Sequence, residues 1–224
     1  SNATAETSAP GLYLVARQHA GETPGSWVLD GLLRRAAQAL DPTQLLIWTV
    51  PLAHLDGIVA VAYGKDPFPR DLNRAWTTPP MRHETRVLQS DLARWAQRAT
   101  PTLAIDFHAP GPTEAEGAFF FLPRTTRPAE SLAAAQNAIA AIAPALPKAL
   151  LHTRPARQVD YPSRWDPTAT LDSHIWDHFA IPCLPLEVPY ASSHNTLFTR
   201  DQYRRLGSAL LEGICAHLQV PLAD

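Results

Sequence analysis

The sequence predicts an α/β fold in which helices cover both faces of a mixed, mostly parallel sheet. Short segments rich in Leu, Ile and Val alternate along the chain with longer segments whose apolar residues recur every three or four positions. The first of the short segments, residues 11–17, is apolar at nearly every position, as expected of a parallel strand that is covered on both faces. With 224 residues, 46% of them hydrophobic, the chain is long enough to bury a full core.

The same patterns place each element in turn. Strands are expected at residues 11–17, 45–50, 102–107, 118–122 and 183–187. Helices are expected at residues 25–40, 84–98, 129–143, 171–179 and 200–218. No periodicity holds over residues 53–80, which four prolines interrupt, or over residues 148–170, so both segments are expected to be irregular. A loop as long as residues 53–80 inside a compact domain is more often functional than structural.

The chain is expected to form one catalytic domain over residues 11–224. Residues 1–10 are expected to be a tag-removal scar, Ser1-Asn2-Ala3, followed by a short leader. The two cysteines, Cys183 and Cys215, fall in apolar contexts without metal-knuckle spacing and are expected to be buried free thiols.

Charge and hydropathy exclude two classes of partner. The net charge is −2 and the basic residues are dispersed, so no nucleic-acid partner is expected. No apolar run approaches the roughly 18 residues needed to cross a bilayer, so no membrane partner is expected either. We expect a cytoplasmic protein.

The strongest functional signal is His19-Ala20-Gly21-Glu22, directly after the first strand. A histidine and a carboxylate three residues apart on a strand-to-helix turn can aim at one point, as a metal site requires. His108 ends another expected strand, Ile105-Asp106-Phe107-His108. The ends of parallel strands are where open α/β sheets place their ligand crevices. His19, Glu22 and His108 therefore predict an open His₂Glu site for one Zn²⁺ ion.

Three further residues complete the chemistry of a hydrolase. Glu187 is the carboxylate at the end of an otherwise apolar last strand, where it can serve as the general base. Arg74 and the neighbouring Asn73 lie at the end of the long loop. An arginine fork matches a carboxylate in bidentate geometry, and an asparagine amide can add a donor beside it.

In this order, the motifs resemble those of the zinc carboxypeptidase family (carboxypeptidase A-like metallopeptidases), over roughly residues 11–189. The first motif, from Arg17 to Trp27, is similar to the Arg-x-His-Pro-Gly-Glu-Thr-x-x-Ser-Trp run of the cytosolic carboxypeptidase branch. The resemblance implies a zinc-dependent metallocarboxypeptidase that hydrolyses the C-terminal peptide or isopeptide bond of its substrate. It implies zinc held by the two histidines and the first glutamate, Glu187 as general base, and a substrate carboxylate held by Asn73 and Arg74.

The chain departs from the family pattern at several points. The family arginine that steadies the oxyanion falls at Gly64 here, so Lys65 or Arg70 is expected to replace it. Tyr161 is the candidate for the family's mobile tyrosine. Relatives carry further strands before the metal motif, so the resemblance implies either a minimal version of the fold or an omitted N-terminal region.

Two other functions stay open. Asp71-Leu72-Asn73-Arg74 and Ile105-Asp106-Phe107-His108 also resemble the aspartoacylase and succinylglutamate desuccinylase deacylases, which cleave N-acyl amino acids. The other open function is that of a binding protein, which keeps the zinc and carboxylate pocket but has lost catalytic turnover because Gly64 replaces the family arginine. The expected partner is thus a peptide or an N-acyl amino acid with a free carboxylate.

Overall fold

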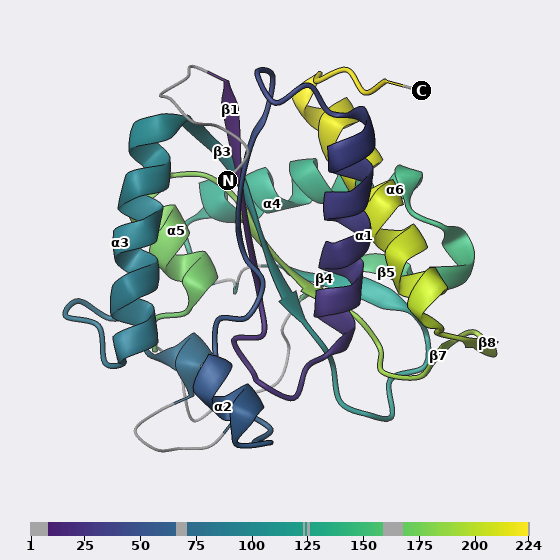
Figure 1. Cartoon of the computed structure of the whole chain (residues 1–224), viewed down its shortest axis with the longest axis horizontal. Coiled ribbons are helices and arrows are strands. Elements are labelled where there is room, and N and C mark those ends of the chain that lie inside the picture. Colours follow the sequence, from purple (N-terminus) through teal and green to yellow (C-terminus); the bar gives the residue numbers. More distant parts are fainter. Residues whose placement is uncertain (1–8, 66–70, 123, 125, 159–167, 224) are drawn as a thin grey trace.

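The computed structural model describes residues 9–65, 71–122, 124, 126–158 and 168–223. Its main feature is a six-stranded sheet in the order β2-β1-β3-β6-β4-β5 (Figure 1). The strands are β1 (Pro10–Ala16), β2 (Leu46–Val50), β3 (Thr100–His108), β4 (Ala118–Leu122), β5 (Leu151–Gln158) and β6 (Cys183–Glu187). A separate short hairpin joins β7 (Ser192–Ser193) to β8 (Thr196–Leu197).

The sheet is mixed and mostly parallel, as the sequence predicts. β1, β2, β3 and β6 run in parallel, β4 is antiparallel to β6, and β5 is parallel to β4. In the register of the central pair, His108 at the end of β3 lies opposite Glu187 at the end of β6. The carboxyl ends of β1, β3 and β6 therefore meet at one edge of the sheet.

Helices cover both faces of the sheet. They are α1 (Pro24–Ala39), α2 (Leu55–Val59), α3 (His83–Arg98), α4 (Ala129–Ile142), α5 (Leu171–Phe179) and α6 (Arg200–Leu218), with short 3₁₀ turns η1 (Leu72–Arg74), η2 (Ala143–Ala145) and η3 (Lys148–Leu150). Figure 1 shows α1 and α6 on one side of the sheet and α3 and α5 on the other. Within the described residues, no helix has the length and hydropathy required to cross a membrane.

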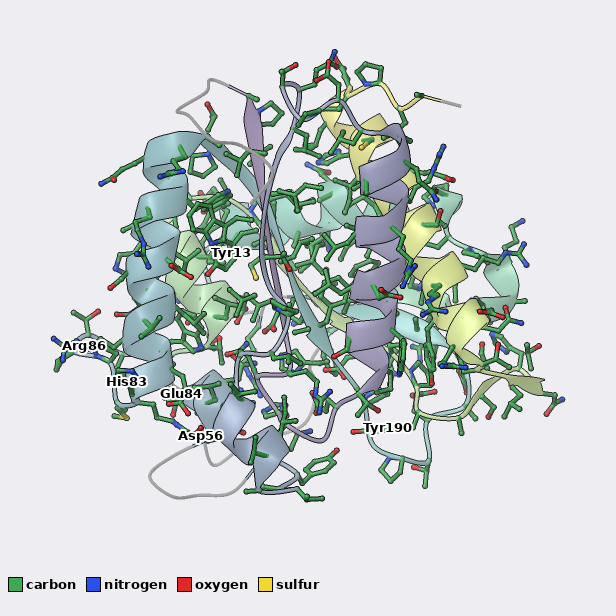
Figure 2. The ribbon with its side chains drawn as sticks, viewed as in Figure 1. Tyr13, Asp56, His83, Glu84, Arg86 and Tyr190 are labelled. Carbon is green, nitrogen blue, oxygen red and sulfur yellow. The ribbon has the colours of Figure 1, made fainter. Side chains whose placement is uncertain are left out.

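Alternation along the strands divides the core in two. Leu12 and Leu14 of β1 pack in a larger cluster with α1, α4 and α6, whereas Tyr13 and Val15 face a smaller cluster with α3 and α5. Tyr13, labelled in Figure 2, lies beside Trp95 of α3 with the ring centroids 5.4 Å apart. Strands buried on both faces in this way explain why the sequence of β1 is apolar throughout.

The structure corrects the predicted elements in two places. The segment 148–170 is not irregular throughout, since β5 forms the sheet edge over Leu151–Gln158. Its sequence, LHTRPARQ, is polar because this edge strand has only β4 as a neighbour, so the apolar signal of a central strand is missing. The long loop likewise contains a short helix, α2, that the absence of periodicity did not reveal.

Candidate metal centre

A sharp turn after β1 delivers the first two candidate ligands. Arg17 takes a positive φ of 65°, in the left-handed region that a residue with a side chain rarely adopts. Its Nε donates to the carbonyl of Ala20 at 2.7 Å, and the backbone N–H of Glu22 donates to the carbonyl of His19 at 3.1 Å. These bonds fold residues 17–22 so that His19 and Glu22 point the same way, just before α1 begins.

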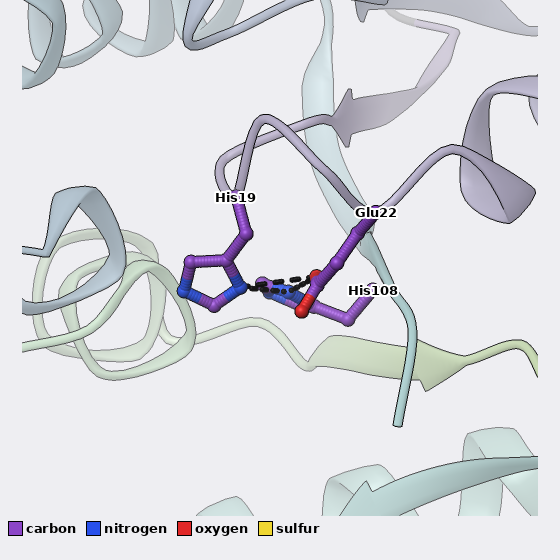
Figure 3. Close-up of side chains that lie close together, drawn as sticks. All are labelled: His19, Glu22 and His108. Atoms are coloured by element: carbon purple, nitrogen blue, oxygen red, sulfur yellow. Dashed lines mark hydrogen bonds and ion pairs between the residues drawn. The ribbon is translucent and has the colours of Figure 1, made fainter. Parts of the chain in front are cut away.

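The three predicted ligands converge on one buried point (Figure 3). The Nδ1 atoms of His19 and His108 are 3.2 Å apart. Glu22 Oε2 lies 3.0 Å from Nδ1 of His19 and 2.8 Å from Nδ1 of His108. The side chains of all three residues are at most 7% exposed.

These distances fit a tetrahedral ion. Bonds of 2.0–2.1 Å from zinc to nitrogen or oxygen set the ligand atoms of a tetrahedron about 3.3 Å apart. The three observed separations, 3.2, 3.0 and 2.8 Å, lie slightly below that value. Two imidazoles and one carboxylate form the donor set of an open catalytic zinc site, which leaves one position for water or substrate.

The outer nitrogens of both imidazoles face carboxylates. His19 Nε2 lies 3.0 Å from Asp71 Oδ1, and His108 Nε2 lies 2.8 Å from Asp106 Oδ2. Gln18, fully buried, donates to Asp106 Oδ2 at 2.7 Å. Carboxylates in such positions orient a ligand imidazole and raise its basicity. The sequence does not reveal the contacts of Asp71 and Gln18, because no spacing rule links these residues to the histidines.

The charges of the cluster favour a cation. Burial lowers the pKa of His108, but Asp106 and Glu22 outweigh it and raise that pKa well above the ordinary value. Burial likewise lowers the pKa of His19, and Asp71 and Glu22 reverse the shift upwards. Burial raises the pKa of Glu22, yet His108 and His19 bring it far below its usual range. Each imidazole thus has a carboxylate on both sides, and a divalent ion can replace the two protons.

Glu187 lies beside this point, opposite His108 in the register of β3 and β6, and its environment differs from that of the three candidate ligands. It is 9% exposed, and its Oε2 atom has no hydrogen-bond partner among the described residues. Burial raises the pKa of Glu187 to about 7, against the lowering effect of His108. A carboxylate whose pKa lies near neutrality is suited to accept and return a proton.

Lys65 reaches this cluster because Gly21 and Gly64 allow the backbone segments that contain them to lie in close contact. The backbone N–H of Gly21 donates to the carbonyl of Tyr63 at 2.8 Å. A Cβ at Gly64, where φ is +94°, would lie 2.3 Å from the backbone nitrogen of Ala20. No arginine fits at position 64 in this backbone. Lys65 Nζ instead forms an ion pair with Glu22 Oε1 at 2.9 Å.

The remaining predicted residues differ in what the structure shows of them. Asn73 is buried, with Nδ2 at 3.1 Å from His108 Nε2 and Oδ1 accepting from the backbone of Leu171. Arg74 is half-buried and donates through Nη1 to the carbonyl of Asn73 at 2.9 Å. Arg70 and Tyr161 lie outside the described residues.

We predict that Asp71→Asn weakens zinc binding about 10- to 100-fold, because His19 then loses the carboxylate that orients it and raises its basicity. Competition with a chelator of known affinity measures the change. Asp201→Asn is the matched control, since its side chain is 93% exposed and lies in α6. Equal zinc affinity in the Asp71 variant and in the wild type would contradict the assigned role.

Comparison with known proteins agrees with this geometry. The family model of the succinylglutamate desuccinylase/aspartoacylase catalytic domain matches residues 8–161. Cytosolic carboxypeptidase 1 of Danio rerio is 32% identical over 109 residues, which are 45% of this chain and 10% of that protein. The predicted resemblance to zinc carboxypeptidases is thereby confirmed, over a small part of that relative's length.

Solved structures share the fold. A metallo-carboxypeptidase from Burkholderia cenocepacia superposes with a TM-score of 0.73 at 21% identity, covering 94% of this chain and 57% of that one. The succinylglutamate desuccinylase from Chromobacterium violaceum superposes with a TM-score of 0.64 at 19% identity, covering 97% and 64%. At these identities the likeness is one of fold, and the chain spans little more than half the length of the first structure.

Proposed function

Since the chain belongs to the succinylglutamate desuccinylase/aspartoacylase catalytic-domain family, we propose that it is a zinc-dependent hydrolase of amide bonds, and specifically a metallocarboxypeptidase. The observation that supports the proposal best is the convergence of His19, Glu22 and His108 on one buried point. Glu187 stands opposite His108 on the neighbouring strand, so the candidate base lies next to the candidate ligands.

The residues divide the chemistry among them. A zinc ion held by His19, Glu22 and His108 would supply Lewis acidity and lower the pKa of water. Glu187 accepts the proton of the attacking water and passes it to the leaving amine, for which its raised pKa is suited. Lys65 supplies a positive charge close to Glu22 and influences the pKa of Glu187, so it is placed to stabilise the oxyanion.

Arg74 is proposed to hold the carboxylate of the substrate. Arg74 Nη1 donates to the carbonyl of Asn73, and a guanidinium carries five N–H donors, so others can bind a substrate carboxylate. Asn73 Nδ2, close to His108, bridges this candidate carboxylate site and the metal centre. A free carboxylate held there would direct the adjacent amide bond towards the metal centre.

A deacylase of N-acyl amino acids is the second candidate, and the family match over residues 8–161 favours it. Both reactions require a site for a free carboxylate, because the amine released in each is an amino acid. They differ in the acyl group, which is a peptide in one and a small acid in the other. The cavity beside Glu187 measures about 630 Å³, which is room for more than an acetyl group and supports the peptidase.

A matched substrate panel tests the proposal. The zinc-loaded protein is incubated with hippuryl-type and dipeptide-based acyl amino acids, and with acetyl and succinyl derivatives of the same amino acids. Release of the C-terminal amino acid from the peptide series, faster than from the acetyl and succinyl series, is the expected result. Faster cleavage of the acetyl and succinyl series would assign the deacylase. If no amino acid is released from any substrate, the remaining interpretation is a binding protein that has lost catalytic turnover because Gly64 replaces the family arginine.

We predict that Lys65→Met lowers kcat/KM about 100-fold, because a positive charge near the developing oxyanion is lost. Lys65→Arg should restore part of the rate. Zinc content should stay near one per chain in both variants, since Lys65 contacts Oε1 of Glu22 whereas Oε2 is the oxygen that faces the two imidazoles. Wild-type kinetics in Lys65→Met would assign the oxyanion role to another group.

A further inference from the structure

A cavity of about 630 Å³ extends from the candidate catalytic centre along β4 and β5. Lys65 and Glu187 line one part of it, and Glu114, Phe119 and Arg157 line another. Asn73 and Arg74 are absent from its described lining, so it is separate from the carboxylate site proposed above. The cavity offers room for a part of the substrate that Arg74 does not hold.

Arg157 is fixed in one orientation at the wall of this cavity. Its guanidinium carbon lies 4.3 Å from the centroid of the Phe119 ring, and Nη1 donates to Glu114 Oε2 at 3.0 Å. Its side chain is 31% exposed, so the group is held but not covered. A guanidinium carries five N–H donors in a rigid fork, and a stacked and paired one loses little freedom when it binds a second carboxylate.

Hydrogen bonds also fix the position of Glu114. Its backbone N–H donates to the carbonyl of Gly111 at 3.0 Å, and its Oε1 accepts the backbone N–H of Glu116 at 2.8 Å. Partial burial raises the pKa of Glu114, but the bonds from Glu116 and Arg157 outweigh burial and bring the pKa below its ordinary value. The carboxylate is therefore ionised at neutral pH, and its side chain is still 18% exposed.

The two groups together select a particular ligand chemistry. The ion pair has no net charge. A ligand with only a carboxylate is attracted by Arg157 but repelled by Glu114, and a ligand with only an ammonium is attracted by Glu114 but repelled by Arg157. A group that carries both charges on one carbon can satisfy both partners at once. We propose that Arg157 and Glu114 form a subsite for an α-amino acid group, with a free ammonium and a free carboxylate, located in the acyl part of the substrate.

This inference rests on the proposed hydrolase for the position of the subsite next to Glu187, but recognition can be measured without turnover. Three amides of glycine serve as probes: γ-glutamylglycine has both charges, glutarylglycine lacks the ammonium, and 4-aminobutyrylglycine lacks the acyl carboxylate. Isothermal titration calorimetry on the zinc-loaded Glu187→Gln protein measures the three affinities. We expect γ-glutamylglycine to bind at least about tenfold more tightly than either of the others, since each lost group removes a charge-assisted hydrogen bond.

Variants on the same background assign each charge. Arg157→Met should abolish the preference over 4-aminobutyrylglycine, and Glu114→Gln should abolish the preference over glutarylglycine. Arg154→Met, an exposed arginine on the same strand, is the control and should leave all three affinities unchanged. Equal affinities for the three probes, or no binding of any, overturns the proposal. Preserved selectivity without hydrolysis by the wild-type protein would instead count against the proposed function alone.

Discussion

Glu187→Gln is expected to lower kcat/KM by about 1,000-fold or more, because a neutral amide cannot accept a proton from water and return it to the leaving amine. The loss should appear in kcat, measured on the best substrate of the panel. Zinc content should stay near one per chain, since Glu187 is not among the three converging ligands. A variant that keeps wild-type turnover would show that another group is the base.

The same substitution should stabilise the metal-free protein at alkaline pH. The pKa of Glu187 is raised by burial from its ordinary value of 4.5 to about 7, so the folded state holds this proton more tightly than the unfolded state. Stability that depends on this group is therefore lost as pH rises from about 4.5 to 7, and stays lost above it. The loss amounts to at most about 3 kcal/mol. Urea titrations at pH 5 and pH 8 should thus show a larger gain in stability of Glu187→Gln over the wild type at pH 8 than at pH 5.

Glu212→Gln is the control for both measurements, because its half-exposed carboxylate lies on α6, on the sheet face covered by α1 and α6. It should change neither turnover nor the pH dependence of stability. A wild-type protein that is as stable as Glu187→Gln at both pH values would show that this carboxyl is not held protonated by burial.

His108→Ala is expected to abolish both zinc binding and hydrolysis. The substitution removes one of three ligands, and two remaining protein ligands do not form a closed or catalytic zinc site. It also removes the imidazole that pairs with the buried carboxylate of Asp106 and leaves Glu22 with one positive partner fewer, so the variant should unfold at a lower temperature. Elemental analysis after dialysis measures the metal, and circular dichroism reports whether the variant is folded.

His174→Ala tests whether a buried histidine outside the converging group is needed for zinc binding. His174 is 7% exposed and packs on Trp76, with the ring centroids 5.4 Å apart, and it is not one of the three converging residues. Its variant should keep one zinc per chain. Loss of zinc in the His174 variant but not in the His108 variant would place the site elsewhere.

Sequence patterns predict the buried elements of this fold well and its edges poorly. The bounds of β4, β6, α5 and α6 agree with those expected, because each carries a clear apolar segment or a helical period. The edge strand β5 has a polar sequence and pairs with one neighbour only, so its place in the sheet depends on tertiary contacts with β4. The helix α2 is five residues long, too short to show a period.

The candidate site follows the same rule. The convergence of His19, Glu22 and His108 could be predicted because a strand end and a strand-to-helix turn have recognisable sequences. Gln18 and Asp71 could not, since their roles depend on which side chains the folded turns bring within 3.0 Å of Asp106 and His19. Arg157 likewise gains its neighbours Phe119 and Glu114 only when β5 joins the sheet beside β4.

X-ray absorption at the zinc edge, on protein loaded with one equivalent of zinc, tests the central claim most directly. The structure predicts two imidazole nitrogens, from His19 and His108, and oxygen from Glu22, at about 2.0–2.2 Å. His108→Ala should lose one imidazole shell or the metal altogether. A sulfur shell at about 2.3 Å, which would have to come from Cys183 or Cys215, or a shell of oxygens only, would contradict the proposed centre.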